Sequence, residues 1–284
     1  MLPAPVSAFI ASQRWGTVTS SQPVAGGCIN DGRILQTSSG PRLFFKSNQT
    51  APADMFLREA DGLAALSAAP GAPRLPATRL AGEHYIVLEY LSPAPQAVGY
   101  WPELGGRLAR LHDTTNPTFG FHGDNYLGTT PQPNGWLADG FAFFAQRRIS
   151  FQAERAQRQG LLSLANLRRA ERLAENLPNL VPVQPASLLH GDLWLGNIIP
   201  GPDGQACLID PAAYFGWAEA ELAMTALFGQ PPESFFAAYA DARPLAPGYR
   251  QRFDLYNLYH LLNHVNLFGA SYLPAVEGIL ARYT

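Results

Sequence analysis

Lysine is nearly absent from this sequence. Of its 20 basic residues, 19 are arginine, and the only lysine is Lys46. The lysine ammonium is a compact point charge, whereas the arginine guanidinium is a broad planar fork. A single retained lysine therefore indicates either a position that arginine cannot fill or a chance survivor of a bias towards arginine.

Cysteine, net charge and long apolar runs are also scarce. Two cysteines, Cys28 and Cys207, cannot build a disulfide framework or a four-cysteine zinc site. A formal net charge of −2 excludes the broad basic surface that binds nucleic acid or anionic lipid. No apolar run approaches the ~18 residues of a membrane-spanning helix. The first thirteen residues contain no basic residue for a secretory signal. We therefore expect a cytoplasmic protein with neither a nucleic-acid nor a membrane partner.

Residues 1–92 predict a small β-rich lobe. The chain has 284 residues, 47% of them hydrophobic, which is enough for one large domain or two lobes. Apolar residues at helical spacing predict helices over 5–14 and 53–66. Apolar segments between turn residues predict five strands, over 17–24, 32–37, 42–47, 74–80 and 84–91.

Residues 93–284 predict a larger and mostly helical lobe. The stretch Ser92-Pro93-Ala94-Pro95 is typical of a linker. Beyond it, helical patterns cover 99–113, 136–158, 161–176, 219–228, 233–240 and 249–268. Residues 187–210 interrupt them with a loop, a short strand, a turn and a second short strand. The sequence therefore predicts an α+β protein of two lobes, the first β-rich and the second helical.

The residues that suggest chemistry lie in HGDLWLGN, residues 190–197, and in the strand that ends at Asp210. Asp192 and Asn197 are five residues apart in one loop, and a tight hairpin would bring Asp210 back beside them. Oxygen ligands of this kind suit Mg²⁺ bridged to phosphate. The pattern H-x-D-x-x-x-x-N, followed by a strand and an Asp, matches the catalytic loop and metal aspartate of kinases. In that interpretation Asp192 takes the proton of the acceptor hydroxyl, and Asn197 and Asp210 hold the metal. Taken singly, each of the three is equally typical of a turn.

The first lobe contains candidates for binding ATP. Lys46 lies on the third predicted strand, where kinases place the lysine that contacts the α- and β-phosphates. Glu59, in the helix that follows, is positioned to pair with it. The remaining candidates are the turn residues Gly26, Gly27 and Cys28, for covering phosphate, and the hinge residues Glu89 and Leu91, for meeting adenine.

An activation loop for peptide substrates has no room in this chain. Asp210 is followed by Pro-Ala rather than Phe-Gly, no A-P-E sequence follows, and only residues 211–218 precede the next helical pattern. We therefore expect the acceptor to be a small molecule or an exposed side-chain adduct.

Five segments of the sequence resemble the fructosamine/ketosamine-3-kinases, relatives of the aminoglycoside phosphotransferases. They are HGDLWLGN (190–197), IDPAAYFGWAEAELAM (209–224), MFLREADGLAAL (55–66), FGFHGDNYLG with PQPN (119–134) and LNHVNLFG (262–269). The tryptophan of the first segment distinguishes that family from most other small-molecule kinases. The resemblance implies a protein-kinase-like fold and ATP-dependent phosphorylation of the sugar 3-hydroxyl of a ketosamine, as a free amine or on protein. The 3-phosphate then eliminates and frees the amine, so the implied role is deglycation.

The resemblance also implies roles for single residues. These are Asp192 as base, Asn197 and Asp210 as metal ligands, Lys46 with Glu59 at the phosphates, and Trp194, Asn263 and His264 at the substrate. Two positions depart from the family pattern. Trp217-Ala218 stands where His-Arg is common, which bears on substrate preference. Glu221 stands where Asp is usual, and we expect it to brace the catalytic loop.

Three other functions are compatible with these residues. Another small-molecule kinase of the same fold would act on an aminoglycoside, choline or homoserine, but Trp194 and the DPAAY sequence favour a ketosamine. A metal phosphohydrolase would use His190, Asp192 and Asp210, although the six histidines are too dispersed for an obvious two-metal cluster. A nucleotide-binding pseudokinase is disfavoured because the catalytic set is complete.

Cysteine chemistry adds a regulatory expectation. We expect Cys207 to be buried in its strand and Cys28 to be exposed in the phosphate-binding turn. Oxidation of Cys28 there would block the nucleotide and would allow a redox-dependent homodimer through this residue.

Overall fold

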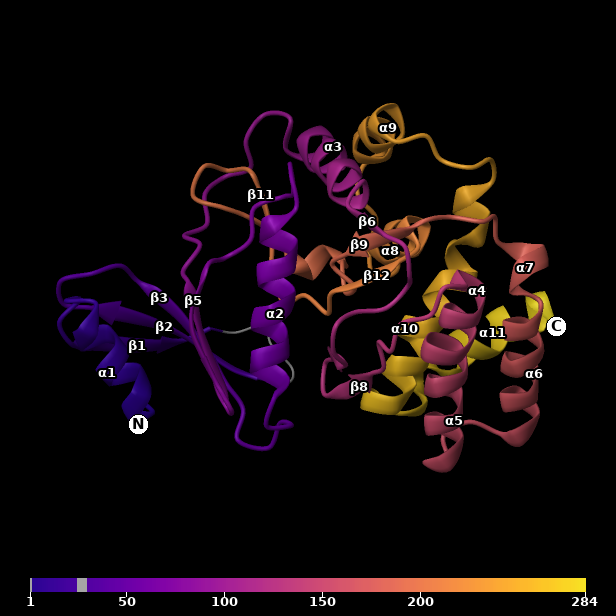
Figure 1. Cartoon of the computed structure of the whole chain (residues 1–284), viewed down its shortest axis with the longest axis horizontal. Helices are drawn as coiled ribbons and strands as arrows, with labels where there is room; N and C mark the ends of the chain where they lie inside the picture. Colours follow the sequence, from indigo (N-terminus) through magenta and orange to yellow (C-terminus); the bar gives the residue numbers. More distant parts are fainter. Residues whose placement is uncertain (1, 25–29) are drawn as a thin grey trace.

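An antiparallel five-stranded sheet forms the N-terminal lobe of the computed structural model, which describes residues 2–24 and 30–284. The strands are β1 (Val18–Pro23), β2 (Asp31–Thr37), β3 (Leu43–Ser47), β4 (Thr78–Gly82) and β5 (Tyr85–Glu89), in the order β1-β2-β3-β5-β4. Helix α1 (Ala4–Ser12) covers one face, where Val6 and Ile10 pack with Leu35, Leu43, Phe45 and Val87. Helix α2 (Met55–Ala68) stands between the sheet and the rest of the molecule (Figure 1).

Helices build most of the second lobe. They are α3 (Tyr100–His112), α4 (Gly140–Phe143), α5 (Phe151–Arg158), α6 (Leu164–Glu175), α7 (Leu177–Leu180), α8 (Ala218–Thr225), α9 (Glu233–Ala242), α10 (Phe253–Phe268) and α11 (Leu273–Tyr283). Short helical segments join them: a π-helix η1 (Phe144–Ser150) and the 3₁₀ turns η2 (Leu195–Asn197), η3 (Tyr249–Arg252) and η4 (Ala270–Tyr272). In Figure 1, α10 and α11 lie beside α4, α5 and α6, away from the N-terminal sheet.

Short strands position the loops at the junction of the lobes. The sheet β12-β9-β6 consists of β12 (Tyr214–Gly216), β9 (Ala186–Leu189) and β6 (Thr115–Asn116). Two hairpins accompany it, β10 (Ile198–Pro200) with β11 (Ala206–Leu208) and β7 (Asn125–Leu127) with β8 (Thr130–Gln132). Because β9 and β12 are antiparallel neighbours, the segment from residue 190 to residue 213, which includes the β10–β11 hairpin, is closed at both ends by one ladder.

The two-lobed arrangement predicted from the sequence is confirmed, with differences in detail. The helix predicted over 136–158 begins only at Gly140 and passes through the π-helix η1, and helix α11 lies beyond the last predicted helix. The fourth strand is displaced to Thr78–Gly82, since Arg74 pairs instead with Cys207 of β11. Strands of two or three residues, such as β6, β7 and β12, are too short to show an alternation of apolar residues in the sequence.

One large core joins the two lobes. It contains Phe56 and Leu63 of α2, Ile86 of β5, and apolar residues from α3, β9 and α10. Cys207 is buried in β11, as predicted, and its thiol is free. None of the helices in the part of the chain that the structure describes is both long and apolar enough to cross a membrane.

Candidate active site

His190 joins the catalytic loop to the strand that ends at Asp210. It follows β9 directly and is fully buried. Its Nε2 donates to the carbonyl oxygen of Ile209 at 2.9 Å, while Nδ1 accepts the Asp192 N–H at 3.3 Å. Burial lowers the pKa of this imidazole, which keeps the ring neutral for these two bonds. Since both nitrogens are occupied within the protein, the phosphohydrolase interpretation loses its histidine ligand.

Glu221 braces the same loop from helix α8, as predicted. Its Oε1 accepts the Gly191 N–H at 2.7 Å and its Oε2 accepts the His190 N–H at 3.1 Å. His112, fully buried on α3, contacts Oε2 at 2.9 Å. Burial alone would raise the pKa of Glu221, but the bonds from His112 and the loop lower it below its ordinary value. These two N–H groups lie in a loop and have no acceptor from a helix or a strand, so the buried carboxylate accepts their hydrogen bonds instead.

Gly191 allows the loop to pass close to the segment after Asp210. Its φ is +84°, and a Cβ there would lie 2.1 Å from the carbonyl oxygen of Ala212. Across this contact the Ala212 N–H donates to the His190 carbonyl at 2.9 Å. Only glycine fits a position that requires both a positive φ and so close an approach.

Asp192 and Asn197 converge as the spacing predicts. The Asn197 side-chain amide donates to the Asp192 carbonyl oxygen at 2.8 Å and approaches its Oδ2 at 3.4 Å. Burial and the nearby charge of Asp210 raise the pKa of Asp192 to about 7. Burial is the larger of the two causes, and the Asn197 bond and the charge of Lys46 offset only part of the shift.

Lys46 connects the two lobes at this point. Its Nζ lies 2.9 Å from Glu59 Oε2 on α2 and 2.9 Å from Asp210 Oδ1 in the second lobe. Burial alone would lower the pKa of this ammonium, but the charges of Asp210 and Glu59 raise it above its ordinary value. Asp210 itself has φ +56°, a conformation that few residues other than glycine adopt. The predicted lysine, its glutamate and the predicted metal aspartate are thus brought together.

The donor atoms present fit a magnesium ion. Asp210 offers a carboxylate, and Asn197 uses its amide nitrogen for the loop, which leaves the amide oxygen as its group for a cation. Hard oxygen ligands in this number, completed by phosphate oxygens, are those that Mg²⁺ prefers.

Trp194 lies at the surface beside this cluster rather than in the core. Its side chain is 37% exposed and covers Gly196, where a Cβ would meet the indole at 2.2 Å. The ring contacts Phe228 edge-on at 6.2 Å, and Phe228 lies 4.8 Å from the ring of His264. Phe268 and Tyr272 complete the group around His264, at 5.4 and 4.9 Å. We call these five residues the aromatic patch.

Asn263 occupies a different place from the one predicted. It is 1% exposed, its Oδ1 accepts a bond from Gln152 at 3.2 Å, and its amide donates to the Leu127 carbonyl at 3.4 Å. These contacts make Asn263 part of the scaffold, and a direct contact with substrate is not supported. The reason is helical geometry: His264, the next residue, lies 100° further around α10 and faces the aromatic patch.

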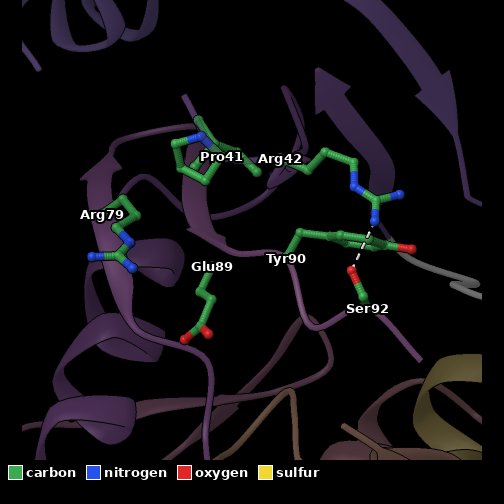
Figure 2. A pocket seen from close by; sticks show the side chains of 7 residues that line it. Pro41, Arg42, Arg79, Glu89, Tyr90 and Ser92 are labelled. Atoms are coloured by element: carbon green, nitrogen blue, oxygen red, sulfur yellow. Dashed lines mark hydrogen bonds between the residues drawn. The ribbon is translucent and has the colours of Figure 1, made fainter. Parts of the chain in front are cut away.

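The hinge between the lobes has its own fixed structure (Figure 2). Arg42 stacks over the ring of Tyr90 at 4.8 Å and donates to Ser92 Oγ at 2.9 Å, beside a hollow of about 270 Å³. The Glu89 carboxylate accepts bonds from Arg74 at 2.6 Å and from the Ala77 N–H at 3.2 Å. Its side chain is therefore used within the protein, and only the main chain here remains for adenine. Leu91 is buried, and its contact with adenine stays a prediction.

The predicted phosphate-covering turn falls outside the described residues. Gly26, Gly27 and Cys28 belong to it. Their contact with ATP and the redox-dependent dimer through Cys28 therefore stay predictions.

Sequence reasoning missed three members of the aromatic patch and one connection between the lobes. Phe228 and Tyr272 belong to none of the five segments, and Phe268, although it lies in LNHVNLFG, is distinguished only by its position beside His264. Tyr126 donates from its hydroxyl to Asp54 Oδ1 at the start of α2, at 2.6 Å. The FGFHGDNYLG segment was the only sequence feature that pointed to this connection. A motif does not indicate which distant residue its side chains will contact.

Proteins of known family are similar in sequence to this chain over most of their length. A family model described as fructosamine kinase matches residues 5–284. A probable ketoamine kinase of Synechocystis sp. is 38% identical over 282 residues, which cover 93% of this chain and 90% of that protein. The chloroplastic protein-ribulosamine 3-kinase of Arabidopsis thaliana is 37% identical, over 98% of this chain and 87% of that protein.

Solved structures agree with these sequences. A crystal structure from Thermobifida fusca, assigned as a fructosamine-3-kinase, superposes with a TM-score of 0.88 at 32% identity and covers 97% of both chains. An ADP-bound aminoglycoside phosphotransferase superposes with a TM-score of 0.63 at 14% identity, over 98% of this chain and 97% of that one, which shows a shared fold. By sequence and by structure, the chain belongs to the fructosamine kinase family.

Proposed function

We propose that this protein is an ATP- and Mg²⁺-dependent kinase that phosphorylates the sugar 3-hydroxyl of ketosamines. The observation that carries the proposal is the convergence of Asp192, Asn197 and Asp210 with the Lys46–Glu59 pair. The exposed Trp194, two residues after the proposed base, adds a place for the acceptor. Membership of the fructosamine kinase family supports the same reaction.

Asp192 is the proposed general base. A carboxylate whose pKa is about 7 is half deprotonated at neutral pH and still basic enough to take a hydroxyl proton. As that proton passes to Asp192, the 3-oxygen forms its bond to the γ-phosphorus of ATP, the bond from that phosphorus to ADP breaks, and ADP leaves. The Asn197 bond to the Asp192 main chain keeps the loop in the conformation that presents the carboxylate.

Lys46, Asn197 and Asp210 hold the phosphates. Asn197 and Asp210 would ligate Mg²⁺, which neutralises charge that develops on the phosphate oxygens when it is bound. Lys46 contributes a fixed positive charge that Glu59 orients. Its single ammonium can lie between two carboxylates 2.9 Å away, a geometry that suits a point charge.

The aromatic patch is the proposed site for the sugar adduct. A flat indole packs on the C–H face of a sugar, while polar groups beside it bind the hydroxyls. His264 suits the second role: burial lowers its pKa, and its Nδ1 lies 2.8 Å from the His260 carbonyl. The neutral ring therefore presents Nε2 as an acceptor for a hydroxyl.

The proposed product explains the biological role. A 3-phosphate on a ketosamine is a leaving group, so its elimination releases the amine from the sugar. The substrate is a glycated amine, free or on an exposed protein side chain. Because ATP is a metabolite of the cytoplasm, we place the reaction there.

A coupled assay of ADP release tests the proposal. The protein is incubated with Mg-ATP and a panel of ribulosamine, erythrulosamine and fructosamine adducts, with an aminoglycoside, choline and homoserine as competing candidates. We expect turnover with at least one ketosamine and recovery of the free amine. Turnover only with an antibiotic, choline or homoserine would contradict the ketosamine assignment.

Asp192→Asn tests the base within the same assay. This variant keeps the size of the side chain but cannot accept the hydroxyl proton, so we expect turnover to fall about 10²–10⁴-fold. The affinity for ATP should stay close to that of the wild type, as measured by nucleotide titration. Turnover near the wild-type value would remove Asp192 from the mechanism.

A further inference from the structure

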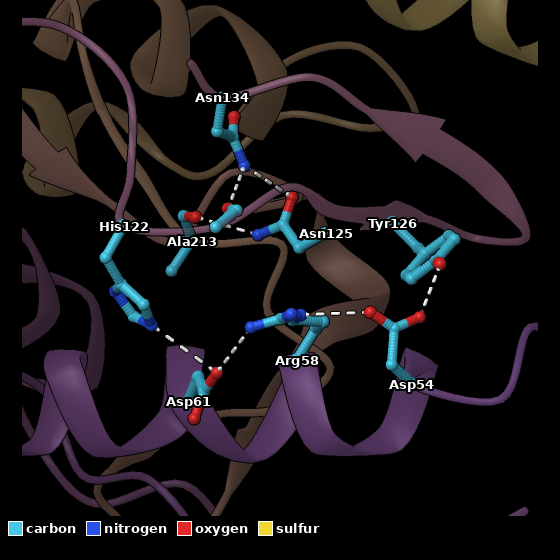
Figure 3. A network of polar contacts seen from close by, with 9 residues as sticks. Asp54, Arg58, Asp61, His122, Asn125, Tyr126, Asn134 and Ala213 are labelled. Atoms are coloured by element: carbon cyan, nitrogen blue, oxygen red, sulfur yellow. Dashed lines mark hydrogen bonds and ion pairs between the residues drawn. The ribbon is translucent and has the colours of Figure 1, made fainter. Parts of the chain in front are cut away.

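We propose that residues 119–134 act as a strap that positions helix α2 for phosphoryl transfer, with Tyr126 as the positioning residue. The proposal rests on the proposed kinase function, because its consequence is the placement of Lys46 and Glu59. It concerns a hydroxyl remote from the phosphates, bonded to the first turn of α2 (Figure 3).

A row of polar side chains connects the strap to α2, and the strap supplies the residue at each end of the row. The Tyr126 hydroxyl donates to Asp54 Oδ1 at 2.6 Å, and His122 Nε2 lies 3.4 Å from Asp61 Oδ2. Arg58 links the two acids, with 3.1 Å to Asp54 Oδ2 and 3.3 Å to Asp61 Oδ2. Figure 3 shows these five side chains as one row of contacts between helix α2 and the strap.

Asp54 is used for this contact instead of its usual local role. It is the N-cap residue of α2, and a side chain of this type normally accepts an N–H from the first helical turn. Here its side chain makes no such bond, because the carboxylate is turned towards Tyr126 and Arg58. The Tyr126 hydroxyl and the Arg58 guanidinium lower the pKa of Asp54. Asp54 therefore bonds to the other lobe instead of capping its own helix. This use of the side chain indicates that Asp54 determines the position of α2.

The other side of the strap is anchored in the second lobe by buried bonds. The Asn125 amide donates to the Ala213 carbonyl at 2.8 Å, and the Gln132 amide donates to the Ala212 carbonyl at 2.9 Å. Behind them, Tyr259 donates to Gln132 at 2.6 Å and the fully buried Arg148 donates to Asn134 at 2.7 Å. The strap is therefore tied to the two alanines that follow Asp210 and Pro211, and it has little freedom to move.

One rigid connection thus determines the relative position of α2 and the metal aspartate. Gly62 of α2 lies against Ala213, where an added Cβ would come within 3.3 Å of the alanine Cβ. Glu59 lies between this contact and Asp54, and its partner Lys46 is bonded to Asp210. Loss of the Tyr126 bond frees the first turn of α2 and increases the population in which Glu59 no longer orients Lys46. Apparent affinity falls in proportion to the competent fraction.

Tyr126→Phe tests the strap, because it removes the hydroxyl and keeps the ring. We expect the KM for ATP to rise about 5- to 10-fold, consistent with the loss of one partly exposed hydrogen bond to a charged group. The KM for the ketosamine should change less than about twofold, and amide hydrogen exchange in residues 55–62 should accelerate. Tyr283→Phe is the matched control, since it also removes a hydroxyl bond, to the Gln251 carbonyl at 3.2 Å, but on α11. This control should behave as the wild type in every measurement.

A double-variant cycle identifies Asp54 as the partner. Asp54→Ala should reproduce the effect of Tyr126→Phe, and the double variant should be no worse than the more impaired single one. Asp54→Asn, which can still accept the hydroxyl, should restore part of the ATP affinity. Wild-type ATP KM together with wild-type exchange of α2 in Tyr126→Phe would overturn the proposal. Hydrogen exchange needs no substrate, so it decides the strap even if the wild-type protein phosphorylates no ketosamine.

Discussion

Lys46 shows how far one side chain depends on its exact chemistry. It is the single lysine among 20 basic residues, and its ammonium contacts a carboxylate from each lobe at 2.9 Å. A guanidinium is longer and presents its donors in a fixed plane, so it cannot occupy the same point between Glu59 and Asp210. Arginine is used at every other basic position, which is consistent with a general bias towards arginine from which only position 46 is excluded by its geometry.

Trp194→Leu tests the residue that we assign to the sugar adduct. Leucine keeps apolar bulk but lacks the flat indole face, so we expect the KM for the ketosamine to rise about tenfold, or about 1.4 kcal/mol. The KM for ATP and the melting temperature should change little, because the ring is partly exposed.

Trp136→Leu is the control for this prediction. Trp136 is 43% exposed and contacts Phe215 at 6.1 Å, outside the aromatic patch. Its replacement should leave the ketosamine KM unchanged. If Trp194→Leu lowers the melting temperature by several degrees with no change in ketosamine KM, Trp194 supports the loop instead.

At the scale of elements, the catalytic loop is held by its surroundings as well as by its own bonds. Glu221 reaches it from α8 and is itself contacted by His112 of α3, and the β9–β12 ladder closes both of its ends. Gly191 is the point at which the loop contacts the segment after Asp210 most closely. A side chain at position 191 must displace the main chain of Ala212, since the nearest atom is the Ala212 carbonyl oxygen.

Gly191→Ala is expected to disrupt this junction. The new Cβ would meet the Ala212 carbonyl at 2.1 Å in addition to the strain of a φ of +84°, so the free energy of unfolding should fall by about 2–4 kcal/mol. Turnover should be lost with it. Gly160→Ala is the matched control, since Gly160 has φ +72° and no atom within 4 Å of an added Cβ.

The comparison of the two variants separates strain from contact. Gly160→Ala should cost only about 1–2 kcal/mol in urea unfolding and should keep full activity. Equal costs for both variants, with activity retained in Gly191→Ala, would show that the loop can move away from Ala212.

At the scale of the whole molecule, buried histidines contribute to the response to acid. Burial, with the nearby His264 and Arg148, lowers the pKa of His260 to about 3, and burial lowers the pKa of His190 in the same direction. Below the ordinary histidine pKa of about 6.5 the unfolded chain binds protons that the folded chain does not. The contribution of these two histidines to the free energy of unfolding therefore falls as the pH decreases from about 6.5 towards 3, while Asp192, whose pKa is raised, contributes in the opposite direction between about pH 7 and 4.

His260→Gln should flatten this dependence. Removing one such group should reduce the slope of unfolding free energy against pH by up to about 1.4 kcal/mol per pH unit between about pH 6 and pH 4. Urea unfolding followed at several pH values measures it, with the difference between variant and wild type taken at each pH. A variant whose stability falls as steeply as that of the wild type would show that His260 is already protonated in the folded protein.

Much of the catalytic machinery was predictable because it is local. Asp192 and Asn197 share one loop, Asp210 follows one short strand, and the hairpin between them is determined by turn residues next to each other in the chain. The five-stranded sheet and α2 were predictable for a similar reason, since alternation and helical spacing repeat within each segment. The π-helix, the shortest strands and the late start of α4 left no such repeat.

The sequence by itself determined which residues we propose for the chemistry, and the tertiary structure decided what holds them in place. The Lys46–Asp210 pair spans 164 positions, and the Tyr126–Asp54 bond spans 72. The aromatic patch is assembled from the catalytic loop, the residues after α8, helix α10 and the turn that follows it. The burial of Asn263 beside the half-exposed His264 follows from the rotation of α10 within the lobe. Contacts of this kind arise when the whole chain packs its apolar surface, and that packing produces no pattern among neighbouring residues from which a partner could be read.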